Sequence, residues 1–371
     1  SRVMWNPLST ERDERFLLTY KDNRPDAHGA FCLAYSDDGI EWREDERNPV
    51  YVALQDTWQN MVYDPRRERW LLFDRPRTYA GVRGVPGGPT EGNYKRRVAV
   101  HLGETPYDFG EPRVLLWPEE VDDSDFDHMV VSRRGNHFIG FLGQMGPPPK
   151  MEFNLHLAFS GDGLHWRQLP DRSVYLPHGN SGEFDCGSTS SAGGVVDRGR
   201  ENFIYYRGSR HGQAQGNRNN VTGIGRARFL HDRFAAQMGE HTGGFLLTRE
   251  MVVAAPEIVV NTTVADGYNT DPSAATVPAE FAVEIVRTEE YSTKRFREEC
   301  HGGGPVPGYT HPQAVPGYTL EACTARAVDL TEQVVRWEEK EDLSELVGQP
   351  VFIRFYLKNC GIYSLRFREP R

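Results

Sequence analysis

A short turn motif occurs twice in this sequence, and it restricts the fold more than any other feature. The first copy runs from Ser36 to Trp42 and the second from Ser160 to Trp166. Both read Ser-x-Asp-Gly-x-x-Trp, and both follow a short apolar segment. Ser and Asp side chains accept N–H bonds within turns and Gly takes φ > 0, so each copy predicts a β-hairpin. Two copies in matching contexts are an internal repeat, which in an all-β pattern predicts β-propeller blades.

Short runs of β-branched and aromatic residues, bounded by turn residues, continue on either side of the two motifs. They divide into similar units, each with a carboxylate-rich leading loop followed by a first strand, an aromatic second strand and a third strand. No segment keeps a helical apolar period. Long Gly/Pro-rich loops between second and third strands are expected to gather at one mouth of the propeller. The units cover residues 3–45, 49–117, 125–169 and 183–238.

The pattern changes after residue 242. From there the apolar residues alternate as they do in the strands of a sandwich, around a Pro/Gly-rich polar stretch at 288–317. The sequence therefore predicts an all-β protein with two domains. We expect a β-propeller over residues 1–242 and a jelly-roll-like β-sandwich over 243–371.

Charge and cysteine content exclude several classes of function. The formal net charge is −10, which argues against a nucleic acid or an anionic membrane as partner. No apolar run reaches the roughly 18 residues of a membrane span. The five cysteines form no CxxC pair, so we expect reduced thiols in a cytoplasmic protein without a cofactor. Export stays an alternative, because the sequence opens inside what reads as a strand region.

Several segments resemble those of the five-bladed β-propeller glycosidase-like proteins, relatives of glycoside hydrolase families 32, 43, 68 and 130. The C-terminal part is similar to a β-sandwich appended in one branch of that group. The segments that carry the resemblance are the two turn motifs, 55–60, 182–185, 232–234, 247–248, 317–323, 335–337 and 342–367.

The resemblance implies a glycoside hydrolase that acts on a sugar through carboxylates in the propeller channel. It also implies five blades, whereas four are visible here, and the first blade of the family carries one of three catalytic carboxylates. Either a blade is missing from this sequence, or a piece has been misread, or a second polypeptide completes the propeller.

Glycosidic cleavage needs two carboxyl groups that face each other across the scissile bond. Propellers present such groups from the innermost strands of successive blades, so the carboxylates that precede those strands are the candidates. We predict Asp56, Asp127 and Glu183 as catalytic residues, with Asp125 and Asp185 as alternates for the last two. Glu183 beside Phe184 is expected to act as the general acid.

Other polar and aromatic residues at the same strand ends are predicted to bind substrate. Trp58 is expected to stack on a sugar face, and the arginines and lysine end aromatic second strands. The predicted binding set is Lys21, Trp58, Asn60, Arg75, His128, Asp185, Tyr206 and Arg207.

Structural roles stay open for these residues. Asp56 also fits an Asx-turn, and the acidic run 122–127 also fits a solvated loop or a calcium site. The function itself has two alternatives from other classes. One is a propeller enzyme with lyase, transferase or cyclase chemistry on a metabolite, and the other is a carbohydrate-binding or assembly protein that has lost its acid pair.

Overall fold

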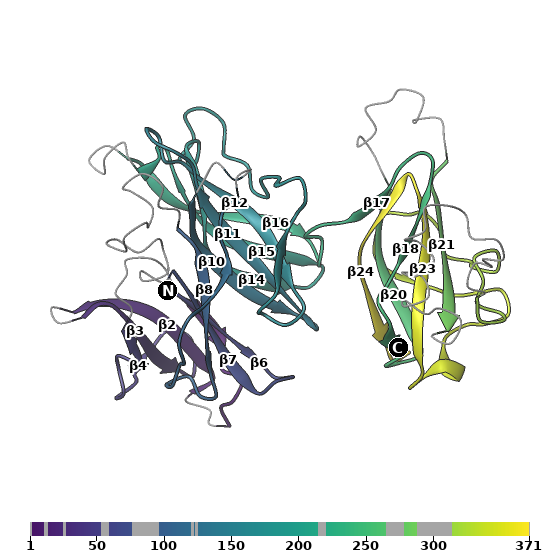
Figure 1. The fold of residues 1–371 in the computed structure, drawn as a ribbon, viewed down its shortest axis with the longest axis horizontal. Coiled ribbons are helices and arrows are strands. Elements are labelled where there is room, and N and C mark those ends of the chain that lie inside the picture. Colours follow the sequence, from purple (N-terminus) through teal and green to yellow (C-terminus); the bar gives the residue numbers. More distant parts are fainter. Residues whose placement is uncertain are drawn as a thin grey trace, which may run out of the picture. The chain divides into compact units, whose positions relative to one another are not determined.

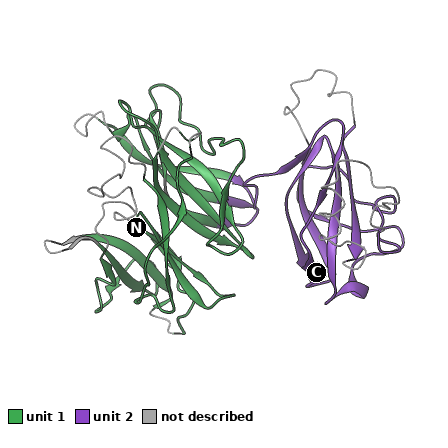
Figure 2. Cartoon of the chain, viewed as in Figure 1, with its two compact units in different colours: residues 1–196, 203–228 green, residues 197–202, 229–371 purple. Residues whose placement is uncertain are grey.

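The computed structural model describes residues 2–10, 14–24, 27–52, 59–75, 96–119, 122, 125–213, 220–264, 278–287 and 314–370. Within these residues β-strands dominate, and the 3-10 helix η6 (Ser344–Leu346) is a short exception. None of the described helices is long and apolar enough to cross a membrane. The chain divides into two compact units, residues 1–196 with 203–228 and residues 197–202 with 229–371 (Figure 2).

The first unit is built from sheets in which the strands pair in the order of the sequence (Figure 1). The first sheet holds β1 (Arg2–Trp5), β2 (Phe16–Arg24), β3 (Ala27–Ser36) and β4 (Arg43–Glu44), with β5 (Tyr51–Val52) also on β3. The second holds β6 (Asn60–Asp64), β7 (Arg69–Asp74), β8 (Val98–Gly103) and β9 (Arg113–Leu116). The third holds β10 (Asp125–Arg134), β11 (His137–Met145), β12 (Phe153–Ser160) and β13 (Trp166–Gln168). The fourth holds β14 (Ser188–Arg198), β15 (Glu201–Ser209) and β16 (Thr222–Leu230).

The first strands of these sheets contact one another. Asn60 on β6 accepts the Val131 N–H at 2.8 Å, and the Arg2 guanidinium on β1 donates to the Val131 carbonyl. Ser132 on β10 accepts the Val195 N–H of β14 at 2.9 Å. Sheets of consecutive strands whose first strands meet in this way are propeller blades. The all-β propeller expected from the repeat is confirmed, with four blades in the described part of the chain.

Both copies of the turn motif close hairpins with the same hydrogen bonds. Asp38 and Asp162 each accept the N–H groups two and three residues further on, at 2.8 to 2.9 Å. Gly39 and Gly163 have φ of +80° and +77°, a conformation that favours glycine. In the second copy the Trp166 indole donates to the Gly163 carbonyl at 2.9 Å and so packs over the turn.

Apolar clusters pack the first three sheets against one another, whereas the first and fourth sheets also have exposed apolar side chains. One cluster packs the first sheet on the second, and another packs the second on the third. The first and fourth sheets, in contrast, expose large apolar side chains: Val3 and Trp5 on β1, Val196 on β14, Tyr205 on β15 and Ile224 on β16. The ring described here therefore has apolar surface left over on its first and last sheets.

A buried histidine–aspartate pair lies inside the second sheet. His101 Nε2 lies 3.1 Å from the Asp74 carboxylate, and Nδ1 lies 2.8 Å from the Gly110 carbonyl. Both ring nitrogens thus face acceptors, which suits the doubly protonated imidazolium. Burial lowers the pKa of His101, but the hydrogen bond and charge of Asp74 outweigh it and raise the pKa above its ordinary value of 6.5.

We expect this pair to make stability fall as the pH rises. A raised pKa in the folded state contributes stability that is fully present below pH 6.5 and is lost as the pH rises through the folded value. Urea unfolding between pH 6 and pH 9 should therefore show a steeper loss for the wild type than for His101→Gln. His241→Gln, at a histidine that no carboxylate contacts in the described part of the chain, should keep the wild-type slope. Parallel profiles for the wild type and His101→Gln would contradict the assignment.

The second unit is a β-sandwich, as expected. One sheet pairs β17 (Gln237–Gly239), β24 (Cys360–Arg368), β20 (Glu257–Val264) and β22 (Leu330–Val334). The other pairs β18 (Gly244–Leu247), β23 (Pro350–Lys358) and β19 (Met251–Val252), with β21 (Glu280–Arg287) also on β23. β17 lies before residue 243, where the sequence pattern changes, and pairs with the last strand.

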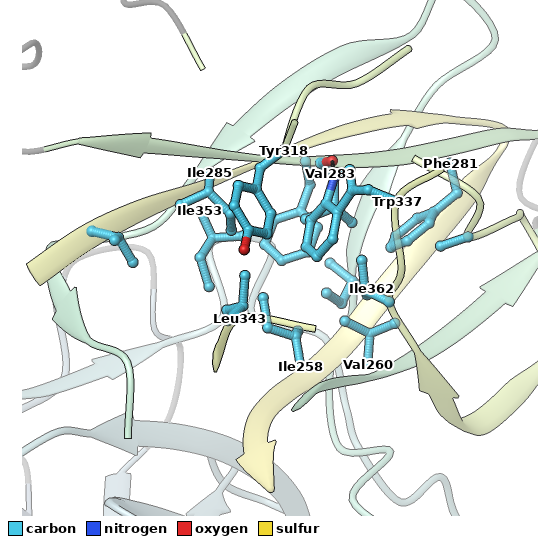
Figure 3. Packing of buried hydrophobic residues seen from close by; sticks show 14 of the residues in the cluster. Ile258, Val260, Phe281, Val283, Ile285, Tyr318, Trp337, Leu343, Ile353 and Ile362 are labelled. Atoms are coloured by element: carbon cyan, nitrogen blue, oxygen red, sulfur yellow. Dashed lines mark hydrogen bonds between the residues drawn. The ribbon is translucent and has the colours of Figure 1, made fainter. Parts of the chain in front are cut away.

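Side chains from both sheets meet in the core of the sandwich. Ile258 and Ile362 come from the first sheet and Val283 and Ile353 from the second (Figure 3). The Trp337 indole lies among them and donates to the Val283 carbonyl at 2.9 Å. This core is a separate apolar cluster from those of the propeller.

Candidate functional site

The strand directions bring many of the predicted site residues to one end of the propeller. β6 and β10 begin there, at Asn60 and Asp125, and β14 begins at Ser188. Because successive strands are antiparallel in the second and third sheets, β7 ends and β8 begins at the same end. We call this end the leading rim: residues 59–60, 75, 96, 125–128, 145, 153 and 183–188.

Asp127 is the centre of a charged cluster at the leading rim. Its Oδ1 accepts hydrogen bonds from the guanidinium groups of Arg75, at the end of β7, and of Arg96, which lies 2.8 Å away. Its Oδ2 lies 3.2 Å from His128 Nδ1. The carboxylate is mostly buried, so two cations and an imidazole replace the water that it has lost. Three of the predicted site residues, Arg75, Asp127 and His128, are thus in contact.

The surroundings hold Asp127 in its ionised form. Burial raises the pKa of this carboxyl, but the hydrogen bond and charge of His128 and the charges of Arg75 and Arg96 outweigh it and hold the pKa at about 2. A carboxylate with this pKa cannot donate a proton near neutral pH. It can attack, accept a proton or stabilise positive charge.

Buried carboxamides lie at the start of β6, at the same rim. Asn60 accepts the Val131 N–H with its Oδ1, whereas its Nδ2 and both polar atoms of Gln59 are buried without a hydrogen-bond partner among the described residues. Buried polar atoms normally have a partner, so unsatisfied ones at a rim are candidates for ligand contacts. Gln59 is not among the site residues predicted from the sequence. The feature that could have identified it is its position directly before β6, the first strand of the second sheet.

The fourth sheet has its own carboxylates at the leading rim. Asp185 is buried, and its Oδ2 accepts a hydrogen bond from the Tyr206 hydroxyl at 2.6 Å. Burial, together with this hydrogen bond, raises the pKa of Tyr206 to about 12. The Phe184 and Tyr206 rings stack with centroids 6.2 Å apart. Glu183 is exposed, and its Oε2 accepts the Asn180 N–H at 2.7 Å.

Two glycines on β15 and β16 leave space for the side chains of Asp185 and Tyr206. A Cβ at Gly208 would lie 2.4 Å from the Asp185 Cβ, and one at Gly225 would lie 2.1 Å from Cζ of Tyr206. A Cβ atom essentially never lies within 3.0 Å of a heavy atom of another residue in this way, so a larger residue at either glycine would force its neighbour to move. Asp185 and Tyr206 therefore lie against a glycine-lined surface of β15 and β16 that fixes their position.

A chain of contacts runs from the Asp127 cluster to the fourth sheet. The rings of His128 and Phe153 lie 6.3 Å apart, and the Phe153 N–H donates to Ser188 Oγ at 3.0 Å. Ser188 is the first residue of β14. The Asp127 group and the Asp185–Tyr206 pair thus belong to neighbouring blades of one rim.

The remaining predicted residues are placed as follows. Lys21 is half-buried on β2, and Arg207 is exposed on β15. Asp56 and Trp58 lie outside the described residues. In the described part of the chain no group of three or more His, Cys, Asp or Glu side chains is arranged to hold a metal. The calcium alternative stays a prediction, because residues 123 and 124 of the acidic run are outside it. Cys186, Cys323 and Cys360 are free thiols.

Comparisons with known proteins gave matches among solved structures alone. No protein-family model and no curated protein matches the sequence. An N-acetylgalactosamine deacetylase from F. plautii, in complex with blood group B trisaccharide, is 14% identical with a TM-score of 0.46, over 62% of this chain and 71% of that one. A β-1,2-mannobiose phosphorylase from Listeria innocua is 10% identical with a TM-score of 0.42, over 58% and 54%.

A thermostable family-43 glycoside hydrolase is also matched, at 12% identity and a TM-score of 0.42, over 60% of this chain and 69% of that one. Family 43 is among those that the sequence resembles. The chain spans 54% to 71% of the length of these three structures. At such identities and TM-scores, the likeness assigns no activity to this chain.

Proposed function

We propose that this chain is a glycoside-processing enzyme that acts on the O-glycosyl bond of a small sugar or glycoside at the leading rim. The observation that carries the proposal is Asp127, a mostly buried carboxylate held ionised by Arg75, Arg96 and His128. A fixed negative charge at a propeller rim suits the oxocarbenium-like transition state of glycosidic cleavage.

The residues divide the work according to their surroundings. Asp127 stays charged and serves as nucleophile, base or charge stabiliser. The proton for the leaving oxygen comes from the fourth sheet, through Glu183 or through Asp185. The unsatisfied amide groups of Gln59 and Asn60 bind sugar hydroxyls. Asp56 and Trp58 are proposed as a third carboxylate and as a stacking surface.

The identity of the acid can be tested with two isosteric variants. If Glu183 is the acid, Glu183→Gln should lower kcat by about 10²–10⁴-fold on a glycoside with a poor leaving group, because the transferable proton is gone. The loss should be much smaller on an aryl glycoside with an activated leaving group, which needs little protonation. Steady-state kinetics on both substrates measure the difference, and Asp185→Asn is assayed in parallel. Near-normal turnover by Glu183→Gln, with the leaving-group dependence seen in Asp185→Asn, would transfer the role to Asp185.

A sugar-binding protein without hydrolytic activity is the second candidate. The observation in its favour is that Glu183 is exposed and already accepts the Asn180 N–H. Saturable binding of a sugar by the wild type, without turnover of any glycoside, would favour this candidate.

We also propose that a second polypeptide completes the propeller with a further sheet. Apolar clusters pack the second sheet on both sides, whereas Trp5 on β1 and Ile224 on β16 are 66% and 77% exposed. A sheet placed between the first and fourth blades would cover both surfaces and bury these side chains.

Native mass spectrometry of the protein from its own cells is expected to show a complex heavier than the single chain. Ile224→Asp should abolish the complex, because it places a charge in the covered surface. Ile40→Asp is the control, since Ile40 is also 77% exposed but lies in the first hairpin turn. A single chain without partner, or equal effects of both variants, would contradict the proposal.

A further inference from the structure

A groove separate from the leading rim lies between the last strands of the second and third sheets. It is formed by the chain at the end of β9 and by the chain that leaves β13, and its volume is about 370 Å³. Typical ligand pockets have about 300–1,000 Å³. We call it the outer groove, and its lining includes Leu115, Trp117, Glu119, Trp166, Gln168 and Arg172. β9 and β13 are the strands most distant from β6 and β10 in the pairing order of their sheets.

Trp117 is the unusual residue of the outer groove. Its side chain is 57% exposed, whereas Trp166 on the opposite wall is 8% exposed and bonded to Gly163. Trp166 has a role in the core, because it packs edge-on against Phe73 with ring centroids 5.8 Å apart. Trp117 has no such role, because its large apolar face meets water at the mouth of the groove.

The polar groups of the groove are planar and fixed in place. The Arg172 guanidinium lies 2.9 Å from Glu119 and 3.5 Å from Asp122, so it joins the two walls. Gln168 accepts a hydrogen bond from Gln144 at 2.8 Å with its Oε1, and its amide N–H groups donate to no group in the described part of the chain. Guanidinium, carboxylate and amide groups offer paired donors and acceptors that match neighbouring hydroxyls.

The charges of the groove balance. Arg167 and Arg172 are opposed by Glu119 and by Asp122, which contacts Arg172. The lining therefore favours neither an anion nor a cation, and its polar groups favour a ligand with many hydroxyls. A sugar ring also has an apolar face that can lie flat on an indole.

We propose that the outer groove is a second sugar-binding site, which holds a neutral oligosaccharide with one ring stacked on Trp117. The choice of a sugar rests on the proposed function, but the site is independent of the chemistry at the leading rim. It would hold a longer glycan on the enzyme while another part of the glycan reaches Asp127.

Calorimetric titration with mannohexaose, xylohexaose and arabinohexaose tests the site, using the full chain with Asp127→Asn to prevent turnover. At least one hexaose should bind, and Trp117→Ala should weaken that binding about tenfold, which corresponds to about 1.4 kcal/mol. Trp117→Phe keeps an aromatic face and should restore part of the affinity. Trp5→Ala is the matched control, because it removes an indole that is exposed to 66% outside the groove, and it should leave the affinity unchanged.

The outcomes separate the two proposals. If no hexaose binds, or if Trp117→Ala binds as tightly as its parent, the second site is overturned. Binding that is lost in Asn60→Ala but kept in Trp117→Ala belongs to the leading rim alone, which overturns the second site and leaves the proposed function standing. Binding that depends on Trp117 supports the second site even if the wild type hydrolyses no glycoside, a result that would overturn the proposed function.

Discussion

Asp127→Asn is expected to lower kcat on a glycoside by about 10²–10⁴-fold. Asn keeps the size and one acceptor of Asp but carries no charge, so it cannot act as a base or offset a developing positive charge. The loss should appear with activated and poor leaving groups alike, in contrast to the loss of an acid. Steady-state kinetics on both substrates measure it, and a variant with wild-type kcat on both would remove Asp127 from the chemistry.

A neighbouring carboxylate provides the control for this variant. Asp125 lies two residues earlier on the same strand and contacts Arg96 at 3.7 Å. Asp125→Asn should keep most of the activity, because Arg96 still pairs with Asp127. A similar loss in both variants would mean that the charge balance of the rim, rather than Asp127 itself, is required.

The same carboxylate also affects stability at low pH. A pKa of about 2, against an ordinary 3.8, means stability that is present above pH 3.8 and is lost as the pH falls toward 2. The shift corresponds to about 2 kcal/mol, which Asp127→Asn removes at neutral pH. A circular dichroism spectrum at the assay temperature and a melting curve of each variant therefore have to accompany the kinetics. If kcat/KM falls as the pH is lowered through pH 4–5, the group that titrates there is not Asp127.

The turns were predictable because their physics is local. Ser36, Asp38 and Gly39 make their hydrogen bonds within a few residues, so the motif contains its own partners. The blades followed from the same information, since strands joined by hairpins pair in sequence order. The start of the sandwich is harder to read, because β17 has its partner on β24 at the other end of the chain.

The site was predictable only where strand ends marked it. Arg75 and Asp127 stand at strand ends of neighbouring sheets, so their meeting follows from the blade pattern. Arg96 was missed because it follows a long Gly/Pro-rich stretch and has no pattern of its own, although it contacts Asp127 from a position two residues before β8.

Glu183 and Asp185 show a different limit of the sequence. The two stand two residues apart in one loop, and the folded chain exposes the first and buries the second against Tyr206. The glycines that make room for Asp185 and Tyr206 lie on β15 and β16, far along the sequence. No local pattern distinguishes the two carboxylates, because the distinction comes from those glycines.

Trp337→Ala is expected to destabilise the sandwich by about 3–5 kcal/mol. The indole is buried, packs edge-on against Tyr318 at 5.0 Å and donates to the Val283 carbonyl. Its removal leaves a large cavity in the apolar cluster and an unsatisfied carbonyl on β21.

Urea unfolding followed by circular dichroism measures the loss, and Trp5→Ala, which removes an exposed indole, should change stability by less than about 0.5 kcal/mol. The sandwich core shares no residue with the propeller clusters, so Trp337→Ala should unfold the sandwich in a separate transition at a lower urea concentration. At urea concentrations below that transition, the variant should keep the kcat of the leading rim. A single transition in which activity and sandwich structure disappear together would show that the propeller depends on the sandwich for its own stability.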